Sequence, residues 1–335
     1  MHKIPVGVLG ASGFAGRELC TLITGHPGLE LAFAAANSRR GESLLVGNGA
    51  DSRTLTMVGT DEAPLGDAAV VFAALPHGAS AEWVARSRAA GAKVVDLSSD
   101  LRPGNHAPAL EPELAAAIGG TAPYGLTEDA RSSLSGASVV ANPGCYPTAV
   151  LLALRPLARR GLIAEDATLV VNAASGVSGA GNSPRPELMF SEVSGNFRAY
   201  GLGNEHRHLP EMRATLASWG VDADLVFTPH LLPVERGILA TITVPLTESV
   251  AEPESLWTAD FANEPFIEVV REAPALRDVV HRNVVRMAVR TLANVRRPSL
   301  QVIAAIDNLV KGAAGQALQN ANVLLGLEET AGLPA

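Results

Sequence analysis

Short runs of apolar residues recur along the first 145 positions, and helix-compatible stretches such as 80–90 separate them. The runs are continuous rather than alternating, which is typical of parallel strands that are covered on both faces. This β-α-β order predicts an α/β fold built on a Rossmann-type, doubly wound parallel sheet. The predicted strands are 6–9, 29–35, 69–74, 93–97 and 138–141.

The pattern changes after Cys145. A helix is predicted over 150–160, and the apolar runs beyond it are longer and alternate with polar positions. Such alternation indicates a mixed or antiparallel sheet with one solvated face. The runs are 237–244, 286–293 and 301–306, and a final helix is predicted over 312–325. We therefore expect a second, α+β domain that begins near residue 147.

Composition narrows the class of protein. The chain has 335 residues, of which 47% are hydrophobic, so it has enough apolar material for two packed domains and is not a disordered chain. Its net charge of −8 disfavours nucleic-acid binding. The sequence shows neither a leader pattern nor an apolar run of about 20 residues, so we expect a protein without a membrane anchor. Two cysteines without a Cys-x-x-Cys pattern favour the reducing cytoplasm.

Glycines recur at every third position around the end of the first predicted strand, at 7, 10, 13 and 16. At such a turn, main-chain N–H groups and the start of the following helix can bind the pyrophosphate of a dinucleotide. The spacing differs from the usual Gly-x-Gly-x-x-Gly, so an ordinary strand-to-helix turn is the alternative. The position at the first βα junction favours the cofactor site. Its candidate residues are Gly10, Ser12, Gly13, Phe14, Ala15 and Gly16.

The end of the second predicted strand favours NADP(H) over NAD(H). The segment Asn37-Ser38-Arg39-Arg40 contains no acidic residue that could bind the ribose hydroxyls. The hydroxyl of Ser38 and the guanidinium groups of Arg39 and Arg40 suit a 2′-phosphate instead. A solvated basic loop is the alternative interpretation.

Cys145 is the candidate nucleophile. It follows a predicted buried strand and opens a helix, where the helix dipole favours a thiolate. A buried, inert thiol is the alternative. Cys20 lies in the middle of a predicted helix, and we expect it to be inert. A thiol beside a nicotinamide suits chemistry in which an acyl group is held as a thioester while hydride is transferred.

Two histidines and a glutamate supply candidate acid–base groups, in the segment His206-Arg207-His208-Leu209-Pro210-Glu211. Imidazoles titrate near neutrality, and a carboxylate beside one can orient it. A metal site and a plain surface pair are the alternatives. No further Cys or His cluster nearby completes a metal site, so we expect none.

Together these residues resemble the N-acetyl-γ-glutamyl-phosphate reductase family almost from end to end. The segments around the thiol and the histidines and the closing block are specific in combination. The matching segments are GASGFAG (10–16), ALPHG (74–78), DLSSDLR (96–102), NPGCYPTA (142–149), SGVSGAG (175–181), HRHLPE (206–211), PHLLPVERGI (229–238) and DNLVKGAAGQALQNANVLLG (307–326).

The resemblance implies a cytoplasmic, NADPH-dependent enzyme of arginine biosynthesis that reduces N-acetyl-glutamyl 5-phosphate to N-acetyl-glutamate 5-semialdehyde and releases phosphate. It also implies a homodimer or homotetramer with two domains in each subunit. We expect an NADP-binding domain over 1–147, a catalytic and dimerisation domain over 148–310, and a C-terminal helix at about 311–328 that packs back on the first domain.

The resemblance also implies roles for individual residues. Cys145 matches the nucleophile, His208 is the expected general acid/base, and Glu211 orients it. His206 is the alternative acid/base, because sequence spacing does not separate the two histidines.

Further residues are expected around the substrate and the cofactor. Arg102 and Asn142 are expected at the substrate or phosphate, with a helix cap or surface ion pair as the alternative for Arg102. Arg236, with His230, is expected at the substrate carboxylate. Ser175 and Gly176 belong to a segment too rich in glycine for the interior of an element. We therefore expect a flexible loop beside the thiol that touches the cofactor, with a long turn as the alternative.

The chain departs from the family pattern at one segment, and three other functions are alternatives to the one that the resemblance implies. Family members usually carry Gly-Ser-Asn or Gly-Thr-Asn where this chain has His281-Arg282-Asn283, which places substrate or cofactor affinity in doubt. The related aspartate-semialdehyde dehydrogenases place a catalytic His where this chain has Ile238, which disfavours that activity. The second rival is a relative from lysine biosynthesis that acts on a carrier-bound aminoadipyl phosphate, and this relative is more similar to the chain. A catalytically silent NADP-binding module is the third rival.

Overall fold

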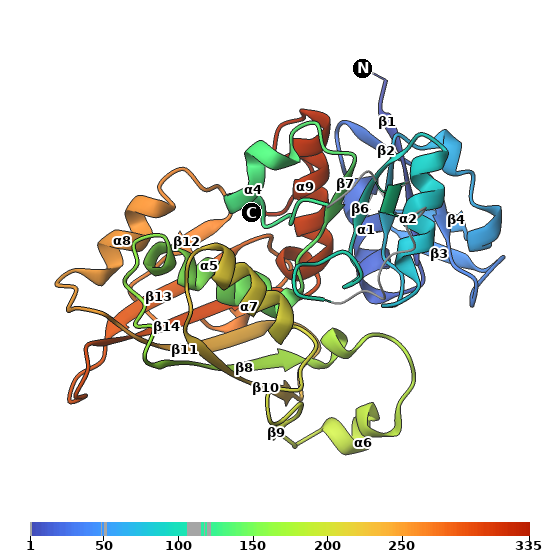
Figure 1. Cartoon of the computed structure of the whole chain (residues 1–335). Helices are drawn as coiled ribbons and strands as arrows, with labels where there is room; N and C mark the ends of the chain where they lie inside the picture. Colours follow the sequence, from blue (N-terminus) through green and yellow to red (C-terminus); the bar gives the residue numbers. More distant parts are fainter. Residues whose placement is uncertain (1, 48, 50–51, 106–114, 117, 119–121) are drawn as a thin grey trace. The chain divides into compact units, whose positions relative to one another are not determined.

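A five-stranded parallel sheet forms the centre of the first half of the chain (Figure 1). Its strand order is β2-β1-β5-β6-β7, so the chain moves outward from β1 in both directions. The reversal lies between β1 and β5, where ligands of doubly wound folds bind at the carboxyl ends of the strands. The strands are β1 (Ile4–Leu9), β2 (Leu29–Ala35), β5 (Val70–Ala73), β6 (Lys93–Asp96) and β7 (Val139–Ala141). The predicted Rossmann-type sheet is confirmed.

Both faces of this sheet are covered, which explains why its strands are continuously apolar. Val6 and Val8 pack on one face in a cluster that includes Leu19 of one helix and Leu318 of another. Alternate strand residues pack on the opposite face, as Val94 does against Val84. The helices are α1 (Phe14–Thr24), α2 (Ser80–Ala89), α4 (Thr127–Leu134) and α9 (Gly315–Leu325).

Short elements complete this part of the structure. An antiparallel hairpin is formed by β3 (Ser43–Val46) and β4 (Arg53–Thr56), and the 3-10 turns η2 (Thr60–Glu62) and η3 (Leu65–Asp67) follow it. The sequence pattern did not predict the hairpin, because its four-residue strands are too short to give a distinct apolar run.

A seven-stranded mixed sheet forms the second half of the chain, in the order β12-β13-β14-β11-β8-β10-β9. β8 and β10 are parallel, whereas β11 is antiparallel to both β8 and β14. The mixed sheet was predicted, and buried and half-buried positions alternate along β11, so its second face is half-buried there rather than fully solvated. The strands are β8 (Thr168–Gly176), β9 (Arg198–Ala199), β10 (Asp224–Leu232), β11 (Ile238–Pro245), β12 (Ile267–Val269), β13 (Val285–Thr291) and β14 (Ser299–Ile306).

The helix α5 (Cys145–Ala158) is the most deeply buried helix of this half, with every residue after Cys145 buried. It packs against β11 and β14 of the mixed sheet. The other helices are α6 (Phe190–Val193), α7 (Leu209–Ser218) and α8 (Pro253–Asp260). The 3-10 turns are η4 (Val177–Ala180), η5 (Pro186–Leu188) and η6 (Leu276–Asp278), and η7 (Val310–Ala314) is a π-helical turn.

The computed structural model describes residues 2–47, 49, 52–105, 115–116, 118 and 122–335. It divides into two compact units, one made of Met1–Gly144 with Ala313–Pro334 and one of Cys145–Gly312 with Ala335. The helix α9 therefore belongs to the same unit as the parallel sheet. Among the described residues, no helix has the length and apolar character that crossing a membrane requires.

Candidate functional site

The glycine-rich loop joins β1 to α1 in the first unit. Gly10 has a φ of +79°, and a Cβ there would lie 2.1 Å from the carbonyl oxygen of Ala74. A Cβ on Gly16 would lie 2.3 Å from the carbonyl oxygen of Gly10. Neither position tolerates a side chain, so the main chain stays tight where the helix begins after Gly13. A cradle of bare main chain at a helix start fits the pyrophosphate of a dinucleotide.

The two arginines after β2 are both paired with carboxylates. Arg39 lies 3.7 Å from Glu42, and Nη2 of Arg40 contacts Oε1 of Glu62. Glu62 is held in place because its other oxygen accepts a hydrogen bond from the amide of Gly59 at 3.3 Å. Glu62 lies 22 positions beyond Arg40, on η2, and no sequence motif marks it as a partner of that arginine. A 2′-phosphate at Arg40 would have to compete with this carboxylate.

Arg102 and Asn142 fix the ends of two neighbouring strands in the first unit. The Nε of Arg102 donates to the carbonyl oxygen of Asn142 at 2.8 Å, and its Nη2 donates to that of Leu97 at 2.7 Å. Asn142 accepts a hydrogen bond from Asn320 of α9 at 2.9 Å. Arg102 is buried, so the alternative of a surface ion pair does not describe it. These contacts hold the main chain three residues before the candidate nucleophile.

Cys145 is the first residue of α5, where the helix dipole favours a negative charge on sulfur. The π-helical turn η7 lies directly behind it, because a Cβ added to Gly312 would be 2.7 Å from the Cβ of Cys145. Asp307 holds this turn: its carboxylate accepts the amides of Leu309 and Val310, and its carbonyl accepts that of Gly312 at 2.9 Å. Gly312 and Asp307 lie in the closing block of the sequence, but their positions there do not predict a contact with the thiol.

A cluster of aromatic and imidazole rings begins at the residue after the thiol. The ring of Tyr146 meets those of His206, His208 and Phe227 edge-on, with centroids 5.4, 6.0 and 5.1 Å away. Its hydroxyl lies 3.1 Å from that of Tyr200. Burial raises the pKa of both tyrosines, and the nearby charge of Cys145 adds to the rise. The tyrosines therefore stay protonated and act as neutral hydrogen-bonding groups beside the thiol.

The structure separates the two histidines. Nδ1 of His206 accepts a hydrogen bond from the amide of His208 at 3.1 Å, so the proton of a neutral ring is on Nε2. Burial, with a smaller contribution from the charge of Arg207, lowers the pKa of His206 to about 4. His206 is therefore neutral near pH 7 and is poorly suited to donate a proton as a cationic acid.

His208 is buried at the start of α7, and Glu211 is fully buried in the first turn of that helix. Residues three apart on a helix lie on the same side, which brings both side chains to one face. His206 places the main chain of His208 through the hydrogen bond to its amide. This arrangement suits His208 as the acid–base group.

The segment at Ser175 and Gly176 is not a flexible loop, and that prediction is wrong. Both residues end the nine-residue strand β8, and a 3-10 turn follows. A Cβ on Gly176 would lie 2.7 Å from the main chain of Glu235 and Arg236. The glycine is required because two main-chain segments approach closely there, a tertiary contact that composition does not reveal.

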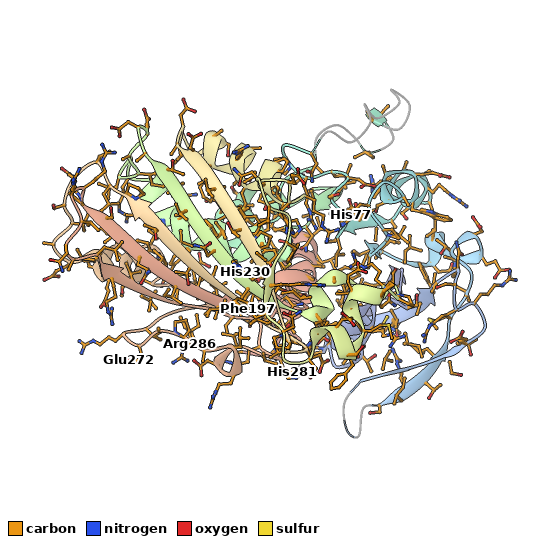
Figure 2. The ribbon with its side chains drawn as sticks, turned by 90° about the horizontal axis from the view of Figure 1, so that it is seen from below. His77, Phe197, His230, Glu272, His281 and Arg286 are labelled. Carbon is orange, nitrogen blue, oxygen red and sulfur yellow. The ribbon has the colours of Figure 1, made fainter. Side chains whose placement is uncertain are left out.

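Arg236 follows β10 and is almost fully buried. Its Nη1 lies 3.5 Å from Oδ2 of Asp307 and 2.5 Å from Nδ1 of His281. His230, expected beside it, instead lies flat against Phe197, with ring centroids 5.1 Å apart, and contacts the carbonyl of Thr228 (Figure 2).

The remaining candidates concern metals and the second thiol. No group of three His, Cys, Asp or Glu residues among those described is arranged to hold a metal ion. Cys20 lies inside α1, and burial raises the pKa of its thiol to about 12, so it stays protonated and unreactive.

Comparisons with known proteins agree with these observations. Residues 5–137 match the family model for the semialdehyde dehydrogenase NAD-binding domain, and residues 145–308 match that for the semialdehyde dehydrogenase dimerisation domain. N-acetyl-gamma-glutamyl-phosphate reductase of Halorhodospira halophila is 41% identical, with 98% of each chain covered. The enzyme of the same name from Neisseria meningitidis is 38% identical, with 99% of this chain and 98% of that one covered.

Solved structures share the fold at lower identity. A probable aspartate-semialdehyde dehydrogenase from Pseudomonas aeruginosa has a TM-score of 0.73 at 21% identity, covering 97% of this chain and 99% of that one. The aspartate semialdehyde dehydrogenase from Candida albicans, solved with NADP, has a TM-score of 0.67 at 17% identity and the same coverage.

Proposed function

Because the chain belongs to the N-acetyl-γ-glutamyl-phosphate reductase family, we propose that it reduces N-acetyl-L-glutamyl 5-phosphate to N-acetyl-L-glutamate 5-semialdehyde and phosphate. The observation that carries this proposal is the thiol of Cys145 at the start of α5, backed by Gly312 and followed by the His206–His208 cluster. The product named here is an intermediate of arginine biosynthesis.

The first half-reaction depends on the Cys145 thiolate. The thiolate attacks the acyl carbon and forms a C–S bond. The C–O bond to the phosphoryl group breaks, and inorganic phosphate departs with the electron pair. The acyl group remains on Cys145 as a thioester. The dipole of α5 stabilises the thiolate before the attack. Gly312 lies so close to Cys145 that a Cβ at position 312 would come within 2.7 Å of the Cβ of Cys145, so the main chain packs tightly behind the nucleophile.

The second half-reaction needs a proton at the carbonyl oxygen. NADPH, when bound, supplies the hydride that reduces the thioester carbon. We assign the proton to His208, which protonates the oxygen as the thiohemiacetal forms and takes the proton back as the C–S bond breaks and the aldehyde leaves. Glu211 orients His208, and His206 positions its main chain. Arg236 binds an anionic group of the substrate.

The cofactor is a nicotinamide dinucleotide, which the matched NAD-binding domain holds. The loop from Gly10 to Gly16 fits it, because Gly10 and Gly16 allow the main chain to pack tightly at the start of α1, where main-chain N–H groups suit a pyrophosphate. We propose NADPH as the physiological form, since the segment from the end of β2 to Arg40 contains two arginines and no acidic residue. We also propose that the second unit forms a homodimer or homotetramer, which the matched dimerisation domain supports.

The preference for NADPH is tested with the double variant Arg39→Ala/Arg40→Ala. Loss of two charged contacts to the 2′-phosphate should raise the KM for NADPH by about 10-fold or more and change that for NADH by less than about twofold. Glu62→Gln should do the opposite and lower the KM for NADPH, because Arg40 loses its competing carboxylate. An equal rise for both cofactors in the double variant would contradict the assignment.

The substrate is tested in the reverse direction with purified protein, NADP+ and N-acetyl-L-glutamate 5-semialdehyde, with and without phosphate. Phosphate-dependent NADPH formation with this aldehyde, and not with aspartate semialdehyde, is the expected result. Folded protein that binds NADP+ but gives no signal would favour a carrier-bound aminoadipyl substrate or a silent binding module.

A further inference from the structure

His281 has a backbone conformation that few residues other than glycine adopt. Among the described residues other than glycine, positive φ angles occur at Asn204, Asn294 and His281, the last at +66°. Asparagine and histidine enter this left-handed region more often than most residues with a side chain, but the conformation still costs free energy in any residue other than glycine. Such strain persists only where the surrounding structure imposes it, and it is concentrated at functional sites.

Two contacts impose this conformation. The amide of His281 donates to Oδ2 of Asp307 at 2.7 Å, and its ring Nδ1 lies 2.5 Å from Nη1 of Arg236. Because a guanidinium group can only donate hydrogen bonds, Nδ1 must be the acceptor and the ring proton must be on Nε2.

These contacts connect His281 to the thiol site through residues of the same unit. Nη1 of Arg236 also lies 3.5 Å from Oδ2 of Asp307. The carbonyl of Asp307 accepts the amide of Gly312, whose Cα lies directly behind Cys145. One carboxylate thus holds both the turn that backs the nucleophile and the pair formed by Arg236 and His281. Figure 2 labels His281 on the segment that precedes β13.

We propose that His281 is a positioning residue that fixes the plane of the Arg236 guanidinium for recognition of an anionic group of the substrate. The inference rests on the proposed function, which places Arg236 at that group. With Nη1 directed to Nδ1 of His281 and to Asp307, the planar guanidinium cannot rotate freely, and its other donors keep one direction. His281 itself does not touch the reacting atoms.

Three variants test this role. His281→Gly removes the acceptor and relieves the backbone strain, so it should fold at least as well as the wild type. His281→Asn tolerates a positive φ and places Oδ1 where Nδ1 was, so it should restore the contact. Asn294→Gly is the matched control, because it removes a side chain at a positive φ in the β13–β14 connection without changing the partners of Arg236.

The readouts are steady-state kinetics with N-acetyl-L-glutamate 5-semialdehyde and, independently of turnover, calorimetric binding of N-acetyl-L-glutamate. We expect His281→Gly to raise the substrate KM and the Kd for N-acetyl-L-glutamate by about 10-fold, the usual effect of losing one charge-assisted hydrogen bond. Its kcat and its KM for NADP+ should stay within about twofold, and His281→Asn should stay near the wild type.

Other results would overturn the proposal. A wild-type KM and Kd in His281→Gly, a loss confined to kcat, or an equal loss in Asn294→Gly would each do so, as would a lack of rescue by His281→Asn. The binding readout separates the two claims. If His281→Gly weakens the binding of N-acetyl-L-glutamate but the wild type never turns over the aldehyde, the proposed function fails while the positioning role of His281 stands.

Discussion

At the scale of single residues, the structure distinguishes two histidines that are equivalent in sequence spacing. Nδ1 of His206 is engaged by the amide of His208, and burial lowers the pKa of His206 to about 4. His208 is itself almost fully buried at the start of α7. On these contacts we propose that His208 transfers the proton and that His206 positions His208.

The assignment makes a kinetic prediction. His208→Asn should lower kcat by about 10²–10⁴-fold, the usual loss for a general acid/base. His206→Asn should cost much less, because Oδ1 of Asn can still accept the amide of residue 208. Steady-state rates at saturating substrate measure both. A large loss in His206→Asn with a small one in His208→Asn would exchange the roles.

The lowered pKa of His206 also predicts how stability depends on pH. In the unfolded chain this histidine takes up a proton as the pH falls below about 6.5, whereas the folded protein resists protonation until about pH 4. Folding is therefore penalised progressively between those pH values, by about 1–2 kcal/mol at pH 5 after allowance for partial exposure.

Urea unfolding at pH 7.5 and pH 5 checks this prediction with His206→Asn as the comparison. The wild type should lose about 1–2 kcal/mol more free energy of unfolding between the two pH values than the variant does. An equal loss in both proteins would mean that the ring of His206 is protonated as easily in the folded state as in the unfolded chain.

At the scale of elements, the π-helical turn η7 is the feature that shapes the nucleophile's surroundings. π-Helical turns are rare and frequently lie at functional sites. A Cβ on Gly312 would come within 2.7 Å of the Cβ of Cys145 and 3.2 Å of its Cα. The turn and the start of α5 therefore fit together only when position 312 is glycine.

Gly312→Ala should displace the thiol. We expect a fall in kcat of about 10-fold or more and a destabilisation of about 1–3 kcal/mol, as for overpacking of a closely packed site. Gly25→Ala is a suitable control, because a Cβ there would meet its nearest neighbour at 3.8 Å. Activity and thermal unfolding of the two variants measure the effect, and wild-type kcat in Gly312→Ala would contradict it.

The elements differ in how well the sequence predicts them. The strands of the parallel sheet are continuous apolar runs, so the predicted 6–9 and 29–35 match β1 and β2 closely. The hairpin β3–β4, the two-residue β9 and the π-helical turn were not predicted. Their conformations depend on short segments and tertiary contacts, which leave little periodicity in the sequence.

The residues of the candidate site also differ in how well the sequence predicts them. Motifs and residue chemistry predict roles for Cys145, His208 and the glycine loop. They did not identify Glu62 beside Arg40 or Asp307 behind Arg236, because these partners lie 22 and 71 positions away in the sequence. The glycine at 176 was misread as a mark of flexibility because the approach of Arg236 to it exists only in the folded chain.

At the scale of the whole molecule, the chain joins a dinucleotide-binding unit to a unit that carries the thiol. The connection falls between Gly144 and Cys145, so the nucleophile is the first residue of its unit. The last stretch of the chain then returns to the first unit as α9, whose Asn320 contacts Asn142.

The central claim is that Cys145 carries the acyl group between two half-reactions. The most direct test mixes the protein with NADP+ and N-acetyl-L-glutamate 5-semialdehyde without phosphate and follows NADPH by stopped-flow absorbance. The account predicts a burst of about one NADPH per active site, an acyl adduct on Cys145 by mass spectrometry, and turnover that resumes when phosphate is added. Cys145→Ser should bind NADP+ but give no burst. Steady turnover without phosphate, or a burst that survives in Cys145→Ser, would contradict the account.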